Sequence, residues 1–315
     1  MTDPTGEPMF KTGRRPPTGA PALKLSQLSA VLPPHPSAYS DGANLRTWKM
    51  LGNDVYGDCV AVTWATQRRI ASWNNSKDIY PNLDQVLQVY KTQNPDFPNQ
   101  DDGMVIQDLL DYLHKTGGPD GVKVVAFAQV DHTNFEELKA ATYLGQQLWL
   151  GVNVSLTNEQ QFNSSLPWTV TGPVIGGHSV TGVGYGDTGV GIETWGNLGS
   201  LSQSYCINIT NPALPGVEEA WLVIWPEQVA LLTQKQRDAF QVAYGQVTGG
   251  KVIDWGSIPP APDPTPPPPP TPTPPPPPVP PTPTPPPAPD PIHQFLVKLR
   301  ELWTMIDKWL KSQGI

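Results

Sequence analysis

The sequence predicts an α+β protein in which a helical half precedes an antiparallel β half. From residue 59 to 145, apolar residues recur at three- and four-residue steps, which is the period of an amphipathic helix. From residue 148 to 225, short runs rich in β-branched and aromatic residues are separated by Gly, Asn and Pro, which is typical of strands joined by turns. A proline run and a short amphipathic segment follow, and they indicate two further parts.

The elements follow one another in a clear order. Helices are expected at residues 59–73, 82–93, 104–118, 134–145 and 227–246, and the third of them ends in Gly-Gly, a helix stop. A strand is expected at 122–130, between the third and fourth helices. The strands of the β half are expected in LWLGVNVSL (148–156), HSVTGVGYG (178–186), VGIETW (190–195), YCINIT (205–210) and AWLVIW (220–225).

The composition excludes several classes of protein. The net charge is −8 and no basic cluster exceeds two residues, so we expect no nucleic-acid partner. The N-terminus lacks the apolar core of a signal peptide, and no apolar run approaches the roughly 18 residues of a membrane span, so we expect cytoplasmic synthesis and no membrane partner. Two distant cysteines are no disulfide framework, and no His/Cys cluster predicts a metal or cofactor.

Four parts are expected along the chain. Residues 1–45 are a Pro-rich extended arm, and residues 46–250 have ordinary globular composition. Residues 251–290 hold most of the 40 prolines and predict a polyproline II linker, which could reach about 100 Å at roughly 3.1 Å per residue. Residues 291–315 predict an amphipathic helix.

The C-terminal helix carries an apolar stripe with coiled-coil spacing. Its members are Ile292, Phe295, Leu299, Leu302, Ile306 and Trp309. We expect residues 291–312 to bind another protein chain or to self-associate, because the stiff linker hinders folding back onto the globular part. The alternatives are a helix packed on its own domain and a membrane-surface helix, the latter weakened by having only four basic residues.

One of the two cysteines stands where a helix is expected to begin. The stretch GNDVYGDCVAVTWAT (52–66) leads through a turn into Cys59. A helix N-terminus lowers the pKa of a thiol, and the thiolate is the nucleophile. This setting favours a catalytic thiol; the alternative is a small buried core residue, which free cysteine often is. Cys206, in the YCINIT run, is expected to be a buried strand residue.

His178 has the most informative setting of the five histidines. It opens an apolar run after two glycines, and the chain turns at YGDTG and returns as a second run to Glu193. In a hairpin the start of the first strand lies beside the end of the second, so we expect His178 to contact Glu193. A carboxylate can orient and support an imidazole base. The alternative is an exposed histidine with an unrelated glutamate nearby.

These segments resemble the active-site segments of the papain-like cysteine peptidase superfamily over about residues 45–225. NDVYGDC is similar to the turn before the family's nucleophile, with Asn53 in the place of a Gln. HSVTGVGYG closely matches the strand that the catalytic His opens, and ETWG matches an Asn-Ser-Trp-Gly motif, with Glu193 in the place of the Asn. The chain departs from the family in having Val60 for a Trp and Tyr56 for a disulfide cysteine.

The resemblance implies a papain-like fold and a role for each residue. Cys59 is the expected nucleophile, His178 the base and then the acid, and Glu193 the residue that orients His178. Asn53 and the Cys59 backbone N–H are expected to stabilise the oxyanion. Four tryptophans are expected in the core and not in a ligand cage: Trp168, Trp195, Trp221 and Trp225.

Two functions remain open from the sequence. The first is a cysteine peptidase-like hydrolase that cleaves peptide or isopeptide bonds in a protein precursor or a peptidoglycan peptide and is anchored to a larger assembly by its linker and C-terminal helix. The alternative is a non-catalytic structural or binding protein that keeps the papain-like fold. The plan of head, rod and helix resembles virion-associated or lysis proteins of phages, which would make the chain virion-associated.

Overall fold

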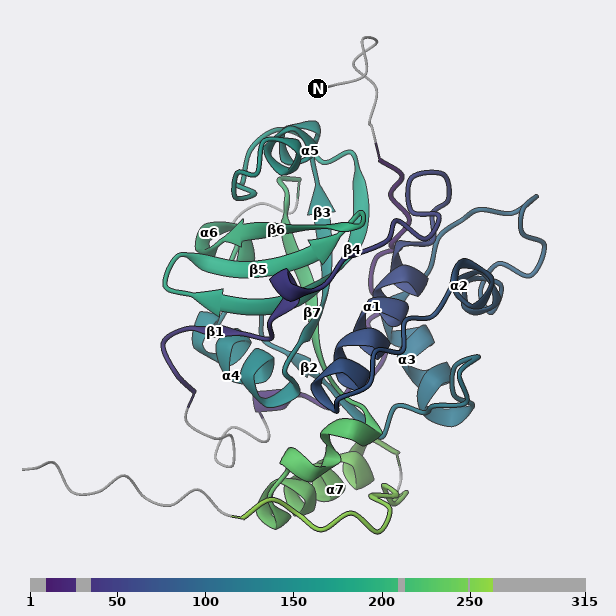
Figure 1. Cartoon of the computed structure of the whole chain (residues 1–315), viewed down its shortest axis with the longest axis vertical. Helices are drawn as coiled ribbons and strands as arrows, with labels where there is room; N and C mark the ends of the chain where they lie inside the picture. The colour runs from purple at the N-terminus through teal and green to yellow at the C-terminus, as the bar shows by residue number, and fades with distance from the viewer. Residues whose placement is uncertain (1–9, 27–34, 209–212, 249, 263–315) are drawn as a thin grey trace, which may run out of the picture. The chain divides into compact units, whose positions relative to one another are not determined.

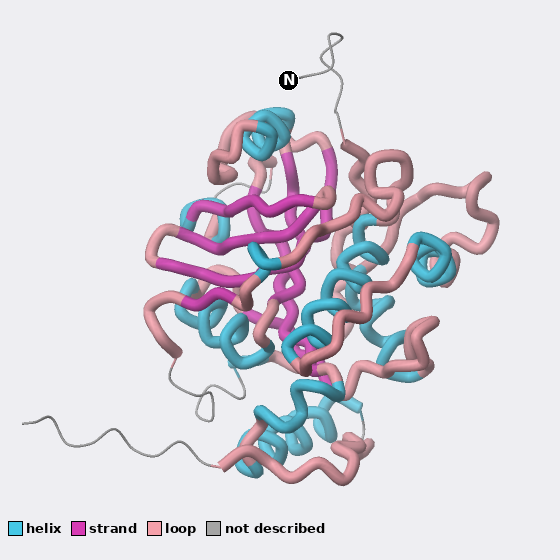
Figure 2. The backbone as a smooth tube through the Cα atoms, in the orientation of Figure 1, coloured by secondary structure: helices cyan, strands magenta, loops and turns pink. Residues whose placement is uncertain are grey.

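The computed structural model of the chain describes residues 10–26, 35–208, 213–248 and 250–262. Most of the linker expected at 251–290, and all of the coiled-coil helix expected at 291–315, lie outside the described residues. Within the described ranges the chain is α+β, as predicted, with helices on one side of an antiparallel sheet and around its edges (Figures 1 and 2).

The elements of the described residues follow the predicted order closely. The helices are α1 (Cys59–Asn74), α2 (Leu83–Tyr90), α3 (Ile106–Lys115), α4 (Phe135–Gly145), α5 (Leu156–Asn163), α6 (Gln203–Cys206) and α7 (Gln234–Thr248), with 3-10 turns η2 (Ala43–Leu45) and η3 (Pro226–Leu231). The strands are β1 (Tyr39–Ser40), β2 (Ala126–Val130), β3 (Leu148–Val154), β4 (Gly176–Gly186), β5 (Gly189–Thr194), β6 (Asn197–Ser202) and β7 (Gly216–Ile224). In the parts described, no helix has the length and apolar character needed to cross a membrane.

Helix α1 is the buried helix of the structure. Apart from its last two residues, the whole of Cys59–Asn74 is buried, including residues on every face. A helix that is covered all round belongs to the interior of a protein. In Figure 1 it lies between the sheet and α2. One core of apolar side chains joins α1, α2 and α3 to the sheet, and Trp149, Trp221 and Trp225 contribute to it from the strand side.

The described strands pair antiparallel in the order β2-β7-β3-β4-β5-β6, and β1 adds to β4. Strand β4 is long, and besides the short β1 it pairs with two longer strands. Its first part, residues 176–182, pairs with β3, and its last part, residues 181–186, pairs with β5. The hairpin predicted around YGDTG is therefore confirmed, but its two strands are paired only from Thr181 onward.

Two local expectations were wrong. Cys206 is buried as expected, yet it ends the helical turn α6, which Ser202 caps by accepting a hydrogen bond from the Tyr205 backbone, so YCINIT does not begin as a strand. The end of the LWLGVNVSL run turns into helix α5, because Ser155 and Asn158 form a capping box there. The four tryptophans expected in the core are all buried.

Candidate active site

Cys59 is the first residue of α1 and is fully buried. Burial raises the pKa of its thiol to about 12, and hydrogen bonds from the backbone of Ser179 and of Gly13 only partly offset that rise. Ser179 directly follows His178 on β4. The structure therefore brings the start of α1 against the start of β4 and against a third element, the N-terminal arm. The predicted approach of the Cys59 sulfur to the His178 ring stays a prediction.

His178 lies at the start of β4, opposite Val152 of β3. Its Nε2 atom lies 2.6 Å from Oγ1 of Thr194, and its ring stacks on Trp195 with the two ring centres 4.5 Å apart. Trp195 and Gly196 both have positive φ, as in the two-residue turn that joins β5 to β6. The turn therefore sets the indole against the imidazole, while the buried Nδ1 atom has no hydrogen-bond partner among the described residues.

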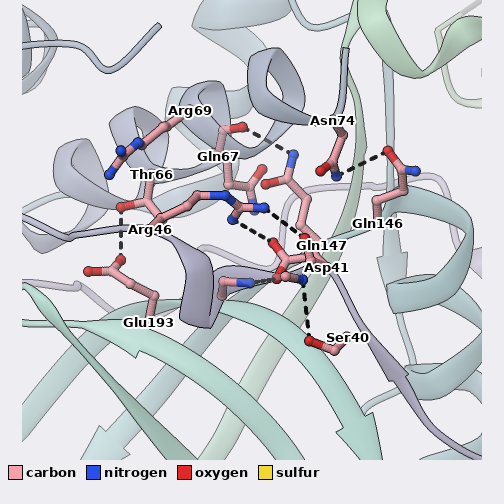
Figure 3. Close-up of polar contacts among 12 residues, drawn as sticks. Ser40, Asp41, Arg46, Thr66, Gln67, Arg69, Asn74, Gln146, Gln147 and Glu193 are labelled. Carbon is pink, nitrogen blue, oxygen red and sulfur yellow. Dashed lines mark hydrogen bonds and ion pairs between the residues drawn. The ribbon is translucent and has the colours of Figure 1, made fainter. Parts of the chain in front are cut away.

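The predicted contact between His178 and Glu193 is wrong. Glu193 pairs with Thr181, which is three residues along β4 from His178, so the two side chains project from opposite faces of the sheet. Figure 3 shows Glu193 pointing toward α1, where it accepts a hydrogen bond from Thr66 at 2.9 Å. Burial raises the pKa of Glu193 to about 8. The next residue, Thr194, has the facing that the prediction gave to Glu193.

Asn53 lies in the turn before α1, where the resemblance required the second oxyanion donor. Its side chain is buried, and its Oδ1 atom has no hydrogen-bond partner among the described residues. Its backbone N–H donates to the Met50 carbonyl at 3.2 Å, which holds the turn. The turn thus keeps an amide side chain in the interior close to the nucleophile in sequence, and its role toward an oxyanion stays a prediction.

Asp58, directly before Cys59, is a second buried acid. It precedes α1 without making a side-chain capping hydrogen bond, and within the part of the chain that the structure describes neither buried carboxylate oxygen has a hydrogen-bond partner in another residue. Burial raises the pKa of Asp58 to about 8, and the nearby Asp101 and Asp54 raise it further. When Asp58 ionises, it also raises the pKa of Cys59. A protonated Asp58 is therefore the form compatible with a thiolate beside it.

The N-terminal arm crosses the site and is held there by backbone hydrogen bonds on two sides. Arg14 forms a parallel bridge with Met104: the Met104 N–H donates to the Gly13 carbonyl and the Arg15 N–H donates to the Met104 carbonyl, each at 2.8 Å. On the other side, the N–H groups of Gly13 and Arg14 donate to the Gly177 carbonyl at 3.1 and 2.9 Å. The arm, purple in Figure 1, thus links the segment before α3 to the start of β4.

Glycines make this passage possible. A Cβ atom on Gly13 would lie 2.0 Å from the Gly57 carbonyl oxygen, and one on Gly103 would lie 1.9 Å from the Gly13 carbonyl oxygen. A Cβ atom on Gly177 would lie 2.3 Å from the Arg14 carbonyl oxygen. Real Cβ atoms do not approach backbone atoms so closely. The arm can therefore pass here only because Gly13 in the arm and the neighbouring Gly57, Gly103 and Gly177 have no side chains.

With the arm in place, Cys59 and His178 are both uncharged. Burial lowers the pKa of His178 to about 3, and the positive charge of Arg14 lowers it further, while the Cys59 thiol has its pKa raised to about 12. At neutral pH the thiol therefore keeps its proton and the imidazole stays uncharged. A thiolate–imidazolium pair requires water or a polar substrate to replace the arm, because burial is the first cause of both shifts. Among the described residues, no group of three or more His, Cys, Asp or Glu side chains could hold a metal ion.

Comparison with known proteins bears on this geometry. No protein-family model and no curated protein matches the chain. Solved structures do: xylellain, a cysteine protease from Xylella fastidiosa, matches at TM-score 0.51 and 18% identity over 68% of this chain and 96% of that chain. The chain has a papain-like fold. The proform of Amb a 11, a ragweed pollen cysteine protease, has TM-score 0.49 at 15% identity, covering 66% of this chain and 70% of that one. The precursor of stem bromelain matches at TM-score 0.44 and 14% identity over 68% of this chain and 76% of that chain.

The sequence did not predict two parts of this site. Thr194 follows the predicted orienting residue, and only the strand register selects it over Glu193. The arm was predicted as extended, but nothing in its composition says where it lies. The available signal was the set of glycines at 13, 57, 103 and 177, because glycine within or beside a strand often marks close approach of another backbone.

Proposed function

We propose that the protein is a thiol peptidase whose cleft is closed by its own N-terminal arm. One observation carries the proposal: an extended peptide backbone, residues 13–15, is already hydrogen-bonded over Cys59 from both walls of the cleft. Main-chain bonds to an extended peptide are a general way to bind peptides of varied sequence. A cleft of this kind favours a peptide chain as the substrate, and we propose that the bond cleaved is a peptide or isopeptide bond.

The chemistry follows from the groups that meet at the cleft. With the arm displaced, His178 takes the proton of the Cys59 thiol, and the sulfur attacks the carbonyl carbon of the substrate. The oxyanion is stabilised by the Cys59 N–H and the Asn53 amide. The amine leaves with the proton from His178, and an acyl-enzyme remains. Water then attacks the acyl carbon, His178 takes its proton, and the carboxylic acid product leaves with the thiol restored.

Thr194 takes the place of an orienting carboxylate or amide. Its hydroxyl bonds Nε2 of His178, and the Trp195 ring covers the imidazole. This holds the ring so that its other nitrogen, Nδ1, is free for the thiol. A hydroxyl stabilises an imidazolium less than a carboxylate does, because it carries no charge. We therefore expect a slower enzyme than one with an acid at this position.

The test uses full-length Gly13→Ala, whose added Cβ forces the arm away from Gly57. This variant, and the same variant carrying Cys59→Ala, are incubated with a fluorescein-labelled casein. We expect release of labelled peptides by Gly13→Ala alone. Equal release from both proteins would contradict a thiol mechanism. No release from Gly13→Ala, in a sample where iodoacetamide readily labels Cys59, would contradict the peptidase proposal.

A second candidate is a non-catalytic protein that keeps the papain-like fold. It is favoured by one observation: among the residues that the structure describes, no charged group forms a hydrogen bond with His178, and Glu193 is directed to Thr66. In that case the opened Cys59 would behave as an ordinary thiol. Its iodoacetamide labelling in Gly13→Ala would rise with a pKa of about 8.5, and casein would stay intact. An active ion pair would instead keep labelling fast well below pH 7.

The anchoring of the enzyme to an assembly rests on the sequence alone. We propose that residues 291–312 bind a partner chain or self-associate, because their apolar stripe has coiled-coil spacing and follows a proline-rich linker. Sedimentation of the full chain and of a chain ending at residue 262 tests this. A larger mass for the full chain supports it, while two equally monomeric proteins that recover equally with the native assembly would contradict it.

A further inference from the structure

The side chain of Arg14 is almost fully buried, although it belongs to the N-terminal arm. Its Nη1 atom donates to Glu219 Oε1 at 3.1 Å, and its Nη2 atom donates to Asn153 Oδ1 at 2.8 Å and also to Glu218. Only 1% of the Arg14 side chain is exposed, and none of the Glu219 side chain. Three acceptors from β3 and β7 thus surround one guanidinium.

The pocket is built around the stem of the arginine as well as around its charge. A Cβ atom on Gly151 of β3 would lie 2.7 Å from Cδ of Arg14, and one on Gly177 would lie 3.1 Å from Nη2. Neither position could carry a side chain while the pocket is filled. The absence of both side chains leaves room for the stem of Arg14, whose Nη1 atom reaches Glu219 at the end of this slot.

The charge at the end of the slot needs a cation. Glu219 accepts a second hydrogen bond from the Trp221 indole at 2.7 Å, which fixes its carboxylate. Burial raises the pKa of Glu219, and the positive charge and hydrogen bond of Arg14 oppose that rise. If the arm leaves, this buried carboxylate loses its partner, so it must take up a proton or remain as a costly unpaired charge. A cationic side chain that enters in place of Arg14 removes that cost.

We propose that this slot is a specificity pocket that selects an arginine side chain in peptides bound to the cleft. The inference rests on the proposed function, since it names the substrates of the same cleft: peptides with an arginine opposite Met104. The preference should be for arginine over lysine. A guanidinium offers two Nη atoms to acceptors on separate strands, as Arg14 does, whereas an ammonium is a single point charge.

The first experiment measures binding without turnover. Full-length protein carrying Gly13→Ala, Arg14→Ser and Cys59→Ala is titrated with fluorescein-labelled peptides, followed by anisotropy. One probe has the sequence of residues 10–17, and the other is penta-alanine with a central arginine in place of one alanine. Each is made with arginine, lysine or citrulline at the test position, because citrulline has the shape of arginine without its charge.

We expect both arginine probes to bind roughly tenfold or more tightly than their citrulline counterparts, since a buried hydrogen bond to a charged group contributes about 1.5–3 kcal/mol. Adding Glu219→Gln should remove most of this ratio. The matched control is the exposed Glu136→Gln, which should leave it unchanged. Equal affinity for arginine and citrulline, or no binding of any probe to the folded protein, would overturn the pocket.

A second measurement keeps the arm in place, in case the triple variant is unstable. Full-length Arg14→Ala leaves the slot empty, and propylguanidine is added to fill it. We expect propylguanidine to raise the Tm of Arg14→Ala but not that of the wild type, and to do so more than propylamine does. A Tm of Arg14→Ala that is indifferent to propylguanidine counts against the slot.

The outcome for the pocket is separable from the outcome for catalysis. If arginine probes bind selectively but the protein with Cys59 intact cleaves none of them, the peptidase proposal fails and the pocket remains. If that protein cleaves arginine and citrulline probes at equal rates and binds them equally, the peptidase stands and the pocket fails.

Discussion

The Nε2 atom of His178 lies 2.6 Å from the hydroxyl oxygen of Thr194. Glu193, one residue earlier, instead accepts a hydrogen bond from Thr66 on the other face of the sheet. Successive side chains of a strand point to opposite faces of the sheet. The residue predicted to orient His178, Glu193, therefore lies on the other face, and Thr194 is the observed partner of the imidazole. This difference leads to different expectations for the two residues.

Thr194→Val should weaken the opened enzyme more than Glu193→Gln does. In the Gly13→Ala background, loss of the hydroxyl removes the hydrogen bond to His178, and we expect kcat/KM for a peptide substrate to fall about tenfold. Glu193→Gln keeps the hydrogen bond from Thr66 and should cost less than about threefold. Cys59→Ala should abolish turnover. A larger loss for Glu193→Gln than for Thr194→Val would show that the carboxylate reaches the site during the reaction.

Gly13→Ala should expose the buried thiol. Cys59 and Cys206 are both buried, and burial raises the pKa of each thiol to about 12, so we expect iodoacetamide to label both slowly in the wild type. The added methyl collides with the Gly57 carbonyl and displaces the arm. Labelling of Cys59, read by mass spectrometry of peptides, should rise roughly tenfold or more, because opening becomes the favoured state.

The matched control for this labelling is Gly186→Ala. A Cβ atom on Gly186, at the end of β4, meets nothing within 4 Å. We therefore expect labelling of both cysteines to match the wild type in this variant. Slow labelling of Cys59 in Gly13→Ala, with the fold intact by circular dichroism, would mean that the arm does not bury the thiol.

Glu193→Gln should reduce the fall in the free energy of unfolding as the pH rises from 5 to 8. Burial raises the pKa of Glu193 from its ordinary 4.5 to about 8, so between these values the folded protein holds a proton that the unfolded chain releases. The free energy of unfolding therefore falls as pH rises through this window. The glutamine does not titrate, and we expect the decline between pH 5 and 8 to shrink by about 3–4 kcal/mol.

Urea unfolding at pH 5, 6, 7 and 8 measures this difference. The exposed Glu136→Gln is the control, because the hydrogen bond from Lys139 lowers the pKa of Glu136 and its titration falls below the window. Asp58, whose pKa burial also raises to about 8, retains part of the slope in Glu193→Gln. Identical slopes for wild type and Glu193→Gln would show that Glu193 is ionised in the folded protein.

His178→Gln should reduce the fall in the free energy of unfolding as the pH drops below 6.5. Burial lowers the pKa of His178 from 6.5 to about 3, so the unfolded chain takes up a proton below pH 6.5 that the folded protein refuses. The free energy of unfolding of the wild type therefore falls as pH drops from 6.5 toward 3. We expect His178→Gln to lose about 2 kcal/mol less than the wild type between pH 7 and 4.5. Parallel losses in the two proteins would mean that His178 gains water or a partner as the pH falls.

Local sequence was enough to predict the elements that carry the chemistry. The turn into Cys59 and the apolar segment after it predict the start of α1, and the glycines around YGDTG predict the β4–β5 hairpin. Both signals are local because hydrogen bonds within a helix and across a tight turn join residues close in the chain. The order of helical and β halves could be predicted for the same reason.

Only the tertiary structure decided which side chains meet. Nothing in the local sequence favours Glu193 over its neighbour Thr194 as the partner of His178. Because Thr181 pairs with Glu193, it is Thr194 that lies on the same face of the sheet as His178. The β4–β5 pairing begins at Thr181, a detail that turn residues do not encode. A register is set by the packing of whole faces, and a shift of one residue would reverse every facing.

The arm and its arginine depended on the tertiary structure most of all. Arg14 and Glu219 are 205 residues apart, and their contact needs the arm, β3 and β7 to meet around two glycines. The hydrophobic periodicity of a sequence does not predict a contact between segments so far apart in the chain. The sequence by itself determined that a thiol begins a helix and an imidazole begins a strand. The long-range packing decided that the arm lies between them and fills a slot shaped for a guanidinium, because burial and close backbone approach arise only when distant segments pack together.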